Sequence, residues 1–177
     1  MAPVIALPAE ALVLLVGPAG AGKSTFAGRW FRTTEVVSSD ACRALVADSG
    51  TDFRATDGAF RVLQAIVTER LRLGRLAVVD ATNVQALSRR PLVGLAGRFG
   101  RPAVAIVFAL SVEDCLDRNR RRQAGRVPAR AVHRQHQDLR LSPVEADGFD
   151  QVHVLASPAE VDAAVVSLSG PRPAGRG

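Results

Sequence analysis

Lysine is nearly missing from this 177-residue chain, tyrosine is missing altogether, and cysteine occurs only as Cys42 and Cys115. Two cysteines that form no CxxC pair make no disulfide framework, so a reducing, cytoplasmic setting is expected. Apolar runs such as Ala11–Val16 are far shorter than the roughly 20 residues that cross a bilayer, which excludes a transmembrane helix. Met1–Val4 carries no basic segment before an apolar run, so a secretory signal is not expected.

The remaining composition is that of an ordinary globular domain, with 47% hydrophobic and 23% charged residues. The length favours one domain, which we place at residues 1–168. The formal net charge is +6, and Lys23 is the sole lysine among 23 basic residues. The excess of arginine has two readings that the sequence leaves open: a coding bias towards GC-rich codons, or a surface for polyanions.

Apolar segments of strand length alternate with longer amphipathic segments along the whole chain. Strands are expected at residues 11–16, 36–38, 76–79, 103–110 and 151–155, and helices at 23–31, 41–48, 55–73, 85–98, 112–122, 129–141 and 158–168. Residues 1–10 are expected to form a lead-in, and residues 169–177 a disordered tail. This alternation predicts an α/β fold with a five-stranded parallel sheet flanked by helices, whose ligands bind at the carboxyl ends of the strands.

A glycine-rich turn follows the first predicted strand. It matches GxxxxGK[ST] throughout, as Gly17-Pro18-Ala19-Gly20-Ala21-Gly22-Lys23-Ser24, and Thr25 follows. Glycines let backbone N–H groups surround phosphate oxygens, Lys23 supplies a compact charge for the β- and γ-phosphates, and the Ser24 hydroxyl is placed to bind Mg²⁺. The motif predicts a P-loop nucleotide-binding protein. A guanine-specific motif needs a second lysine, so ATP is favoured over GTP.

Acidic residues also follow the second and third predicted strands. Asp40 comes just after residues 36–38, one helical turn before Arg43, where a carboxylate could accept a proton from an attacking hydroxyl while Arg43 holds an anionic part of the acceptor. Asp80 ends the strand at 76–79 and could hold Mg²⁺, and Thr82 and Asn83 offer hydrogen-bonding groups to an acceptor. The plainer alternatives are that Asp40 caps a helix and Asp80 caps a turn.

The segment from about residue 112 to residue 141 is rich in arginine. Arg118 and Arg122 lie four residues apart, on one face of a predicted helix. Such a run is often only a solvated basic face, but after the fourth strand of a P-loop protein it suits an arginine-rich helical lid. Arginines of a lid stabilise the charge of the phosphoryl group that is being transferred.

Taken together, the motifs GxxGxGKST, SSDxCR, DATN and RNxxR resemble the kinase module of bacterial polynucleotide kinase–phosphatase, a P-loop 5′-OH polynucleotide kinase. The resemblance runs from about Leu12 to Leu155. It implies that Lys23 and Ser24 bind the phosphates and Mg²⁺, that Asp40 is the general base, and that Arg43 clamps a phosphate of the acceptor. It further implies that Arg118 and Arg122 contact the ATP phosphates, that Arg126 does so less certainly because its spacing is looser, and that Asp80 and Thr82 organise the acceptor site.

Three functions are therefore compatible with the sequence. The leading one is an ATP- and Mg²⁺-dependent kinase that phosphorylates a 5′-OH end of RNA or DNA. A second is a small-molecule P-loop kinase that acts on a sugar, an antibiotic or a zeta-toxin-like acceptor. A third is an ATP-binding regulatory module without phosphoryl transfer. The resemblance also makes a separate phosphatase or ligase a candidate partner, and no interaction with membranes is expected.

Overall fold

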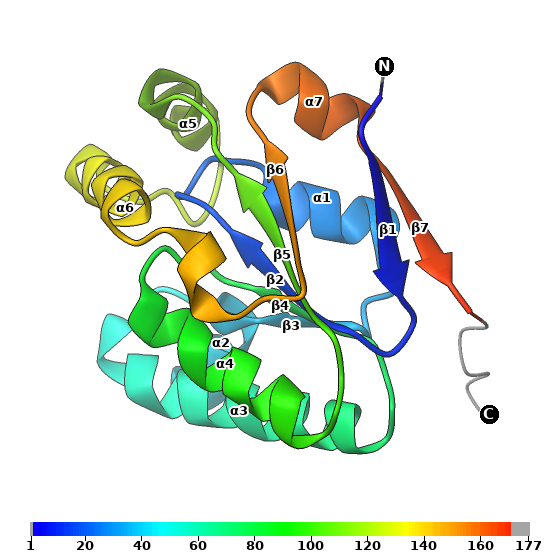
Figure 1. The fold of residues 1–177 in the computed structure, drawn as a ribbon. Coiled ribbons are helices and arrows are strands. Elements are labelled where there is room, and N and C mark those ends of the chain that lie inside the picture. The colour runs from blue at the N-terminus through cyan, green and yellow to red at the C-terminus, as the bar shows by residue number, and fades with distance from the viewer. Residues whose placement is uncertain (1, 171–177) are drawn as a thin grey trace.

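A single parallel sheet forms the centre of the computed structural model, which describes residues 2–170 (Figure 1). Its five strands stand in the order β3-β4-β2-β5-β6, and all of the neighbouring pairs are parallel. The strands are β3 (Val36–Ser38), β4 (Ala77–Asp80), β2 (Leu12–Val16), β5 (Ala103–Phe108) and β6 (Gln151–Leu155). The prediction of an α/β fold with a five-stranded parallel sheet is confirmed, and the strand that carries the glycine-rich turn is its central strand.

Helices cover both faces of this sheet. They are α1 (Lys23–Trp30), α2 (Ser39–Ala47), α3 (Thr56–Arg72), α4 (Ala86–Arg98), α5 (Val112–Arg120), α6 (Ala129–Leu141) and α7 (Pro158–Ala163), with short 3-10 turns η1 (Phe53–Ala55) and η2 (Val144–Asp147). Figure 1 shows α2, α3 and α4 below the sheet, α1 and α7 above it, and α5 and α6 beyond one end of the strands.

The alternation of side chains along β2 divides the core into two halves. Val13 and Leu15 pack with α1 and α5, whereas Leu12, Leu14 and Val16 pack with α3 and α4. All five are fully buried, which explains why the strand appears as an unbroken apolar run instead of an alternating one. Strand β2, which leads into the glycine-rich turn, is thus packed between two hydrophobic layers.

A second, two-stranded parallel sheet corrects two predictions made at the ends of the chain. β1 (Val4–Pro8) pairs with β7 (Val165–Ser169), in register from Val4 opposite Val165 to Pro8 opposite Ser169. The lead-in at residues 1–10 is therefore partly strand, and the helix predicted over 158–168 was wrong beyond Ala163, because Ala164 turns the backbone to an extended conformation. Ser169 belongs to β7, and residues 171–177 of the predicted tail lie outside the described residues.

The carboxyl ends of the central strands lie level with one another. In the register of the sheet, Asp80 is the partner of both Ser38 and Leu15, so the ends of β3, β4 and β2 meet at one edge. The phosphate loop, Asp40 and the DATN turn leave the sheet from this edge. Within residues 2–170, no helix combines the length and the apolar character that crossing a bilayer would need.

Candidate functional site

The loop between β2 and α1 has the strand–loop–helix setting that a phosphate loop requires. Gly20 and Gly22 adopt left-handed backbone angles, with φ of 86° and 96°. A Cβ on Gly20 would lie 2.1 Å from the carbonyl oxygen of Cys115, so no side chain fits between the loop and α5. These glycines place the loop at the amino end of α1, where backbone N–H groups favour an anion.

Lys23 is buried under this loop. Its Nζ donates hydrogen bonds of 2.8 Å to the carbonyl of Gly17 and of 2.9 Å to that of Pro18. Burial lowers the pKa of Lys23 to about 8, opposed by the nearby charge of Asp80 and reinforced by Arg122. The negative charge of Asp40 is a further, smaller cause that raises the pKa of Lys23.

A cavity of about 300 Å³ opens beside the phosphate loop. Ser24 and Thr25 line one side of it, and Arg118 and Arg122 line another. Arg118 lies so close that a Cβ on Gly22 would come within 2.9 Å of its Nη1 atom. The two arginines that the sequence placed on one face of a helix therefore meet at the loop, forming a concave, positively charged site of the kind that phosphates occupy.

Asp162 on α7 is a member of this cavity that sequence reasoning missed. Its backbone carbonyl accepts a 2.9 Å hydrogen bond from Arg29, and its carboxylate lies 3.9 Å from Nη2 of Arg118. Asp162 thus helps to orient the guanidinium of Arg118 beside the phosphate loop. Nothing in the local sequence marks it, because its partners Arg29 and Arg118 lie on other helices, far from Asp162 along the chain.

Arg126 is placed differently from the other predicted lid residues. Its Nη2 donates hydrogen bonds to the carbonyls of Arg120 and Arg122, at the end of α5, and it does not line the cavity. Arg126 thus closes the turn after α5 in this structure. Within the phosphate loop itself, the carbonyl of Pro18 accepts a hydrogen bond from the N–H of Ala21.

The candidate acceptor side begins where β3 passes into α2. The hydroxyl of Ser38, not Asp40, caps the helix by accepting from the N–H of Ala41. Asp40 is therefore free of the capping role, and its side chain is 76% exposed. Its Oδ1 accepts a 2.7 Å hydrogen bond from Nη1 of Arg43, which also donates to the carbonyl of Gly50 at 2.8 Å.

Burial sets the properties of the residues next to Asp40 on α2. Arg43 is buried, and its Nε atom has no hydrogen-bond partner among the described atoms. Cys42 packs in the core, where burial raises the pKa of its thiol and keeps it protonated. The arrangement presents one exposed carboxylate held by one buried guanidinium, which suits a base beside an anion-binding group.

The DATN turn after β4 ties the phosphate loop to the rest of the sheet. The carbonyl of Thr82 accepts a 2.9 Å hydrogen bond from the N–H of Gly17. The amide of Asn83 is buried and donates to the carbonyl of Leu15 at 2.8 Å, while its Oδ1 has no partner among the described atoms. Asn83 is thus placed inside the protein, whereas Asp80 remains at the sheet edge near Lys23.

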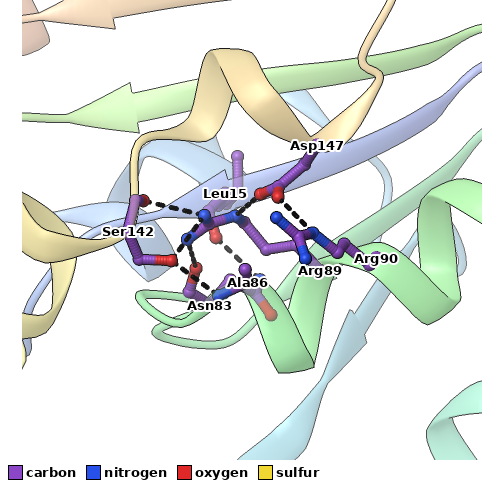
Figure 2. Close-up of polar contacts among 7 residues, drawn as sticks. All are labelled: Leu15, Asn83, Ala86, Arg89, Arg90, Ser142 and Asp147. Carbon is purple, nitrogen blue, oxygen red and sulfur yellow. Dashed lines mark hydrogen bonds and ion pairs between the residues drawn. The ribbon is translucent and has the colours of Figure 1, made fainter.

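Arg89 on α4 holds this turn and the end of α6 together (Figure 2). Its side chain is fully buried and donates to Asp147 at 2.5 Å, to the carbonyl of Asn83 at 2.9 Å and to the carbonyl of Ser142 at 2.8 Å. Arg90 donates to the other oxygen of Asp147 at 2.9 Å. A signal for Arg89 exists in the sequence, since it is spaced three and seven residues before the buried Leu92 and Ala96.

Oxygen ligands suited to Mg²⁺ are present at the site. Ser24 lines the cavity with its hydroxyl-bearing side chain, and Asp80 is the last residue of the neighbouring strand β4. This hard-oxygen donor set fits a magnesium ion that shares its coordination with nucleotide phosphates and water. A larger cavity of about 610 Å³ lies elsewhere, near Glu35, Ile66 and Leu76, away from the phosphate loop, so we do not assign the chemistry there.

Comparison with known proteins assigns the class. Residues 12–142 match the family described as AAA domain (AAA_33), and the chain belongs to that family. Transcription factor bHLH140 of Arabidopsis thaliana is 29% identical over 163 residues, an alignment that takes in 88% of this chain but 17% of the relative. The chain therefore spans less than a fifth of that protein's length.

Solved structures place the fold among P-loop kinases. A chain in the Pnkp1/Rnl/Hen1 RNA repair complex is 27% identical with a TM-score of 0.66, covering 81% of this chain and 47% of the other. The APS kinase CysC of Mycobacterium tuberculosis, solved in complex with AMPPNP and APS, is 18% identical with a TM-score of 0.55, covering 88% and 94%. The second likeness shows the fold alone, and this chain spans about half of the first.

Proposed function

We propose that the protein is an ATP- and Mg²⁺-dependent kinase that transfers the γ-phosphate of ATP to a 5′-OH end of RNA or DNA. The observation that carries the proposal is the exposed Asp40 carboxylate, bound by Arg43 at 2.7 Å and electrostatically coupled to Lys23 of the phosphate loop. The 27% identity with a chain of an RNA repair complex supports a polynucleotide acceptor. The formal net charge of +6 also favours a polyanionic substrate.

Each residue has a part in this reaction. Backbone N–H groups at the end of the loop and the start of α1, from Gly22 to Thr25, surround the phosphates of ATP, and Lys23 exchanges its bonds to the loop carbonyls for bonds to phosphate oxygens. Arg118 and Arg122 neutralise charge on the phosphoryl group as it moves. Ser24 and Asp80 would hold Mg²⁺, which would offset the negative charge of the phosphates.

The acceptor hydroxyl is activated from the opposite side. Asp40 takes the proton of the 5′-OH as its oxygen attacks the γ-phosphorus, and ADP leaves in line with the attack. Arg43 holds Asp40 in place and binds a phosphate of the acceptor strand. Thr82 follows β4 at the same strand ends, where its hydroxyl could hydrogen-bond the acceptor.

A small-molecule acceptor is the second candidate, because the same fold is found in a kinase of adenosine phosphosulfate. The two are separated by incubating the protein with γ-labelled ATP, Mg²⁺ and a panel of acceptors. The panel contains RNA and DNA oligonucleotides with a 5′-OH, the same oligonucleotides with a 5′-phosphate as controls, and gluconate as a small polyhydroxylated acid. We expect label on the 5′-OH oligonucleotides alone; label on gluconate alone, or on no oligonucleotide, contradicts the proposal.

A further inference from the structure

Phe53 is the one exposed aromatic side chain on the described part of the molecule. The chain has seven phenylalanines and one tryptophan, and all eight are described. Phe53 is 65% exposed, while Phe26, Phe31 and Phe108 are buried and the other four are partly buried. Exposing a single phenylalanine is not unusual by itself, so its place on the molecule decides whether it has a role.

That place is on the acceptor side, against Arg43. The guanidinium carbon of Arg43 lies 5.2 Å from the centre of the Phe53 ring, within the range of a cation–π contact. Nη1 of the same guanidinium is bonded to Asp40 at 2.7 Å. The guanidinium of Arg43 therefore lies between the carboxylate of Asp40 and one face of the Phe53 ring.

The ring is also held in position by its surroundings. η1 begins after Asp52, whose carboxylate accepts from the backbone N–H of Arg54 at 3.1 Å and fixes the turn that carries Phe53. Arg43 in turn is anchored to the carbonyl of Gly50, three residues before Phe53. A ring fixed in this way loses little conformational entropy when a ligand stacks on it.

We propose that the outer face of Phe53 is a stacking platform for the base of the acceptor's 5′-terminal nucleotide. Nucleobases stack on exposed aromatic rings whatever their identity, which gives affinity for a strand end without sequence preference. Two guanidinium groups lie beside the ring, that of Arg43 paired with Asp40 and the exposed one of Arg54 paired with Asp52, and both can offer N–H groups to the phosphates that accompany such a base. This inference rests on the proposed function and specifies which part of a polynucleotide the site binds.

The test measures KM for a 5′-OH oligonucleotide and KM for ATP in the wild type, Phe53→Ala and Phe53→Leu. Phe53→Leu keeps an apolar side chain and removes the ring. We expect both variants to raise KM for the oligonucleotide by about 5- to 100-fold, the loss typical of one stacked base. KM for ATP should stay within about twofold, since Phe53 does not line the nucleotide cavity.

A second substrate makes the test specific to stacking. An oligonucleotide of the same length that lacks only its 5′-terminal base should have the same KM with the wild type and with Phe53→Ala. Wild-type KM in Phe53→Leu, or an equal loss on the abasic oligonucleotide, overturns the platform while leaving the kinase assignment intact. Failure of the wild type to phosphorylate any oligonucleotide overturns both.

Discussion

The side-chain oxygen of Gln135 accepts a 2.8 Å hydrogen bond from the backbone N–H of Ala19, which joins α6 to the phosphate loop. Two more contacts hold the same helix. Asp138 accepts from Gln85 at 2.9 Å, and Ser142, just after α6, accepts from Arg89. The arginine-rich segment is therefore attached to the nucleotide site through its second helix, and the position of α6 is coupled to the shape of the loop.

Replacing Gln135 by alanine should weaken ATP binding. The N–H of Ala19 would lose its partner, and a hydrogen bond of this kind contributes about 0.5–1.5 kcal/mol, so Kd for ATP should rise by about two- to twelvefold. Titration calorimetry with a non-hydrolysable ATP analogue measures this directly. Gln137→Ala, at an exposed position of the same helix, is the matched control and should leave Kd unchanged. Equal Kd values in all three proteins would show that the contact is not coupled to nucleotide binding.

Gly20→Ala should destabilise the protein, while Gly94→Ala should not. Gly20 has a φ of 86°, and an added Cβ would meet the carbonyl oxygen of Cys115 at 2.1 Å, so the loop or α5 must move. We expect a loss of at least about 2 kcal/mol in the free energy of unfolding. Gly94 lies in α4 with nothing within 4 Å of an added Cβ, and alanine there should stabilise by up to about 1 kcal/mol. Urea unfolding of both variants checks this, and a neutral Gly20→Ala would refute the close packing of loop and α5.

Arg89 and Arg90 bind the same carboxylate, but their replacement should have very different costs. The side chain of Arg89 is 0% exposed and that of Arg90 is 61% exposed. Arg89→Met removes a buried partner and should cost about 3–5 kcal/mol of stability. Arg90→Met should cost less than about 1 kcal/mol, because an exposed ion pair is screened by water. Similar unfolding free energies for the two variants would contradict the buried network in Figure 2.

Binding of ATP should depend on pH through Lys23. Burial lowers the pKa of Lys23 to about 8 in the free protein, and phosphate oxygens around Nζ should raise it again. The complex then binds more protons than the free protein, so affinity falls as the pH rises above about 8 and a proton is taken up on binding. Calorimetry at pH 9 in two buffers of different ionisation enthalpy measures that uptake.

The matched control for this prediction is Lys23→Arg, whose guanidinium stays protonated at pH 9. Any nucleotide that the variant still binds should bind without proton uptake at this position. The free protein shows the same linkage in its stability: neutralising Lys23 removes the cost of a buried charge, so this contribution to stability increases between about pH 8 and the ordinary lysine pKa. If the wild type and Lys23→Arg took up equal numbers of protons on binding ATP at pH 9, the proton would belong to another group.

The middle of the central sheet was predictable because β2, β4 and β5 are buried along almost their whole length and therefore stand out as apolar runs. The same reasoning failed for β1 and β7, since neither is buried along its length and each pairs only with a segment from the other end of the chain. Val165–Ser169 follows the start of a helix without a glycine or proline between them, so local pattern extended α7 too far.

The site was predictable where a motif is contiguous and not where contacts are distant. Arg118 and Arg122 lie together, as their spacing of four residues indicated, and line one cavity with Lys23. The contact of Gln135 with Ala19 and that of Asp162 with Arg118 join elements whose packing no short pattern encodes. Arg89 and Arg90 are chemically identical neighbours, and only the periodicity of α4 distinguishes the buried one from the exposed one.

The proposed kinase reaction depends most directly on Asp40. The measurement that tests it is the single-turnover rate of γ-phosphate transfer to a 5′-OH oligonucleotide, with saturating ATP and Mg²⁺, in the wild type and in Asp40→Asn. The asparagine keeps a side-chain oxygen that can accept from Arg43 but cannot take the proton of the hydroxyl. We expect the rate to fall by about 10²- to 10⁴-fold with Kd for ATP unchanged. Transfer by Asp40→Asn at the wild-type rate would contradict the assignment of Asp40 as the general base.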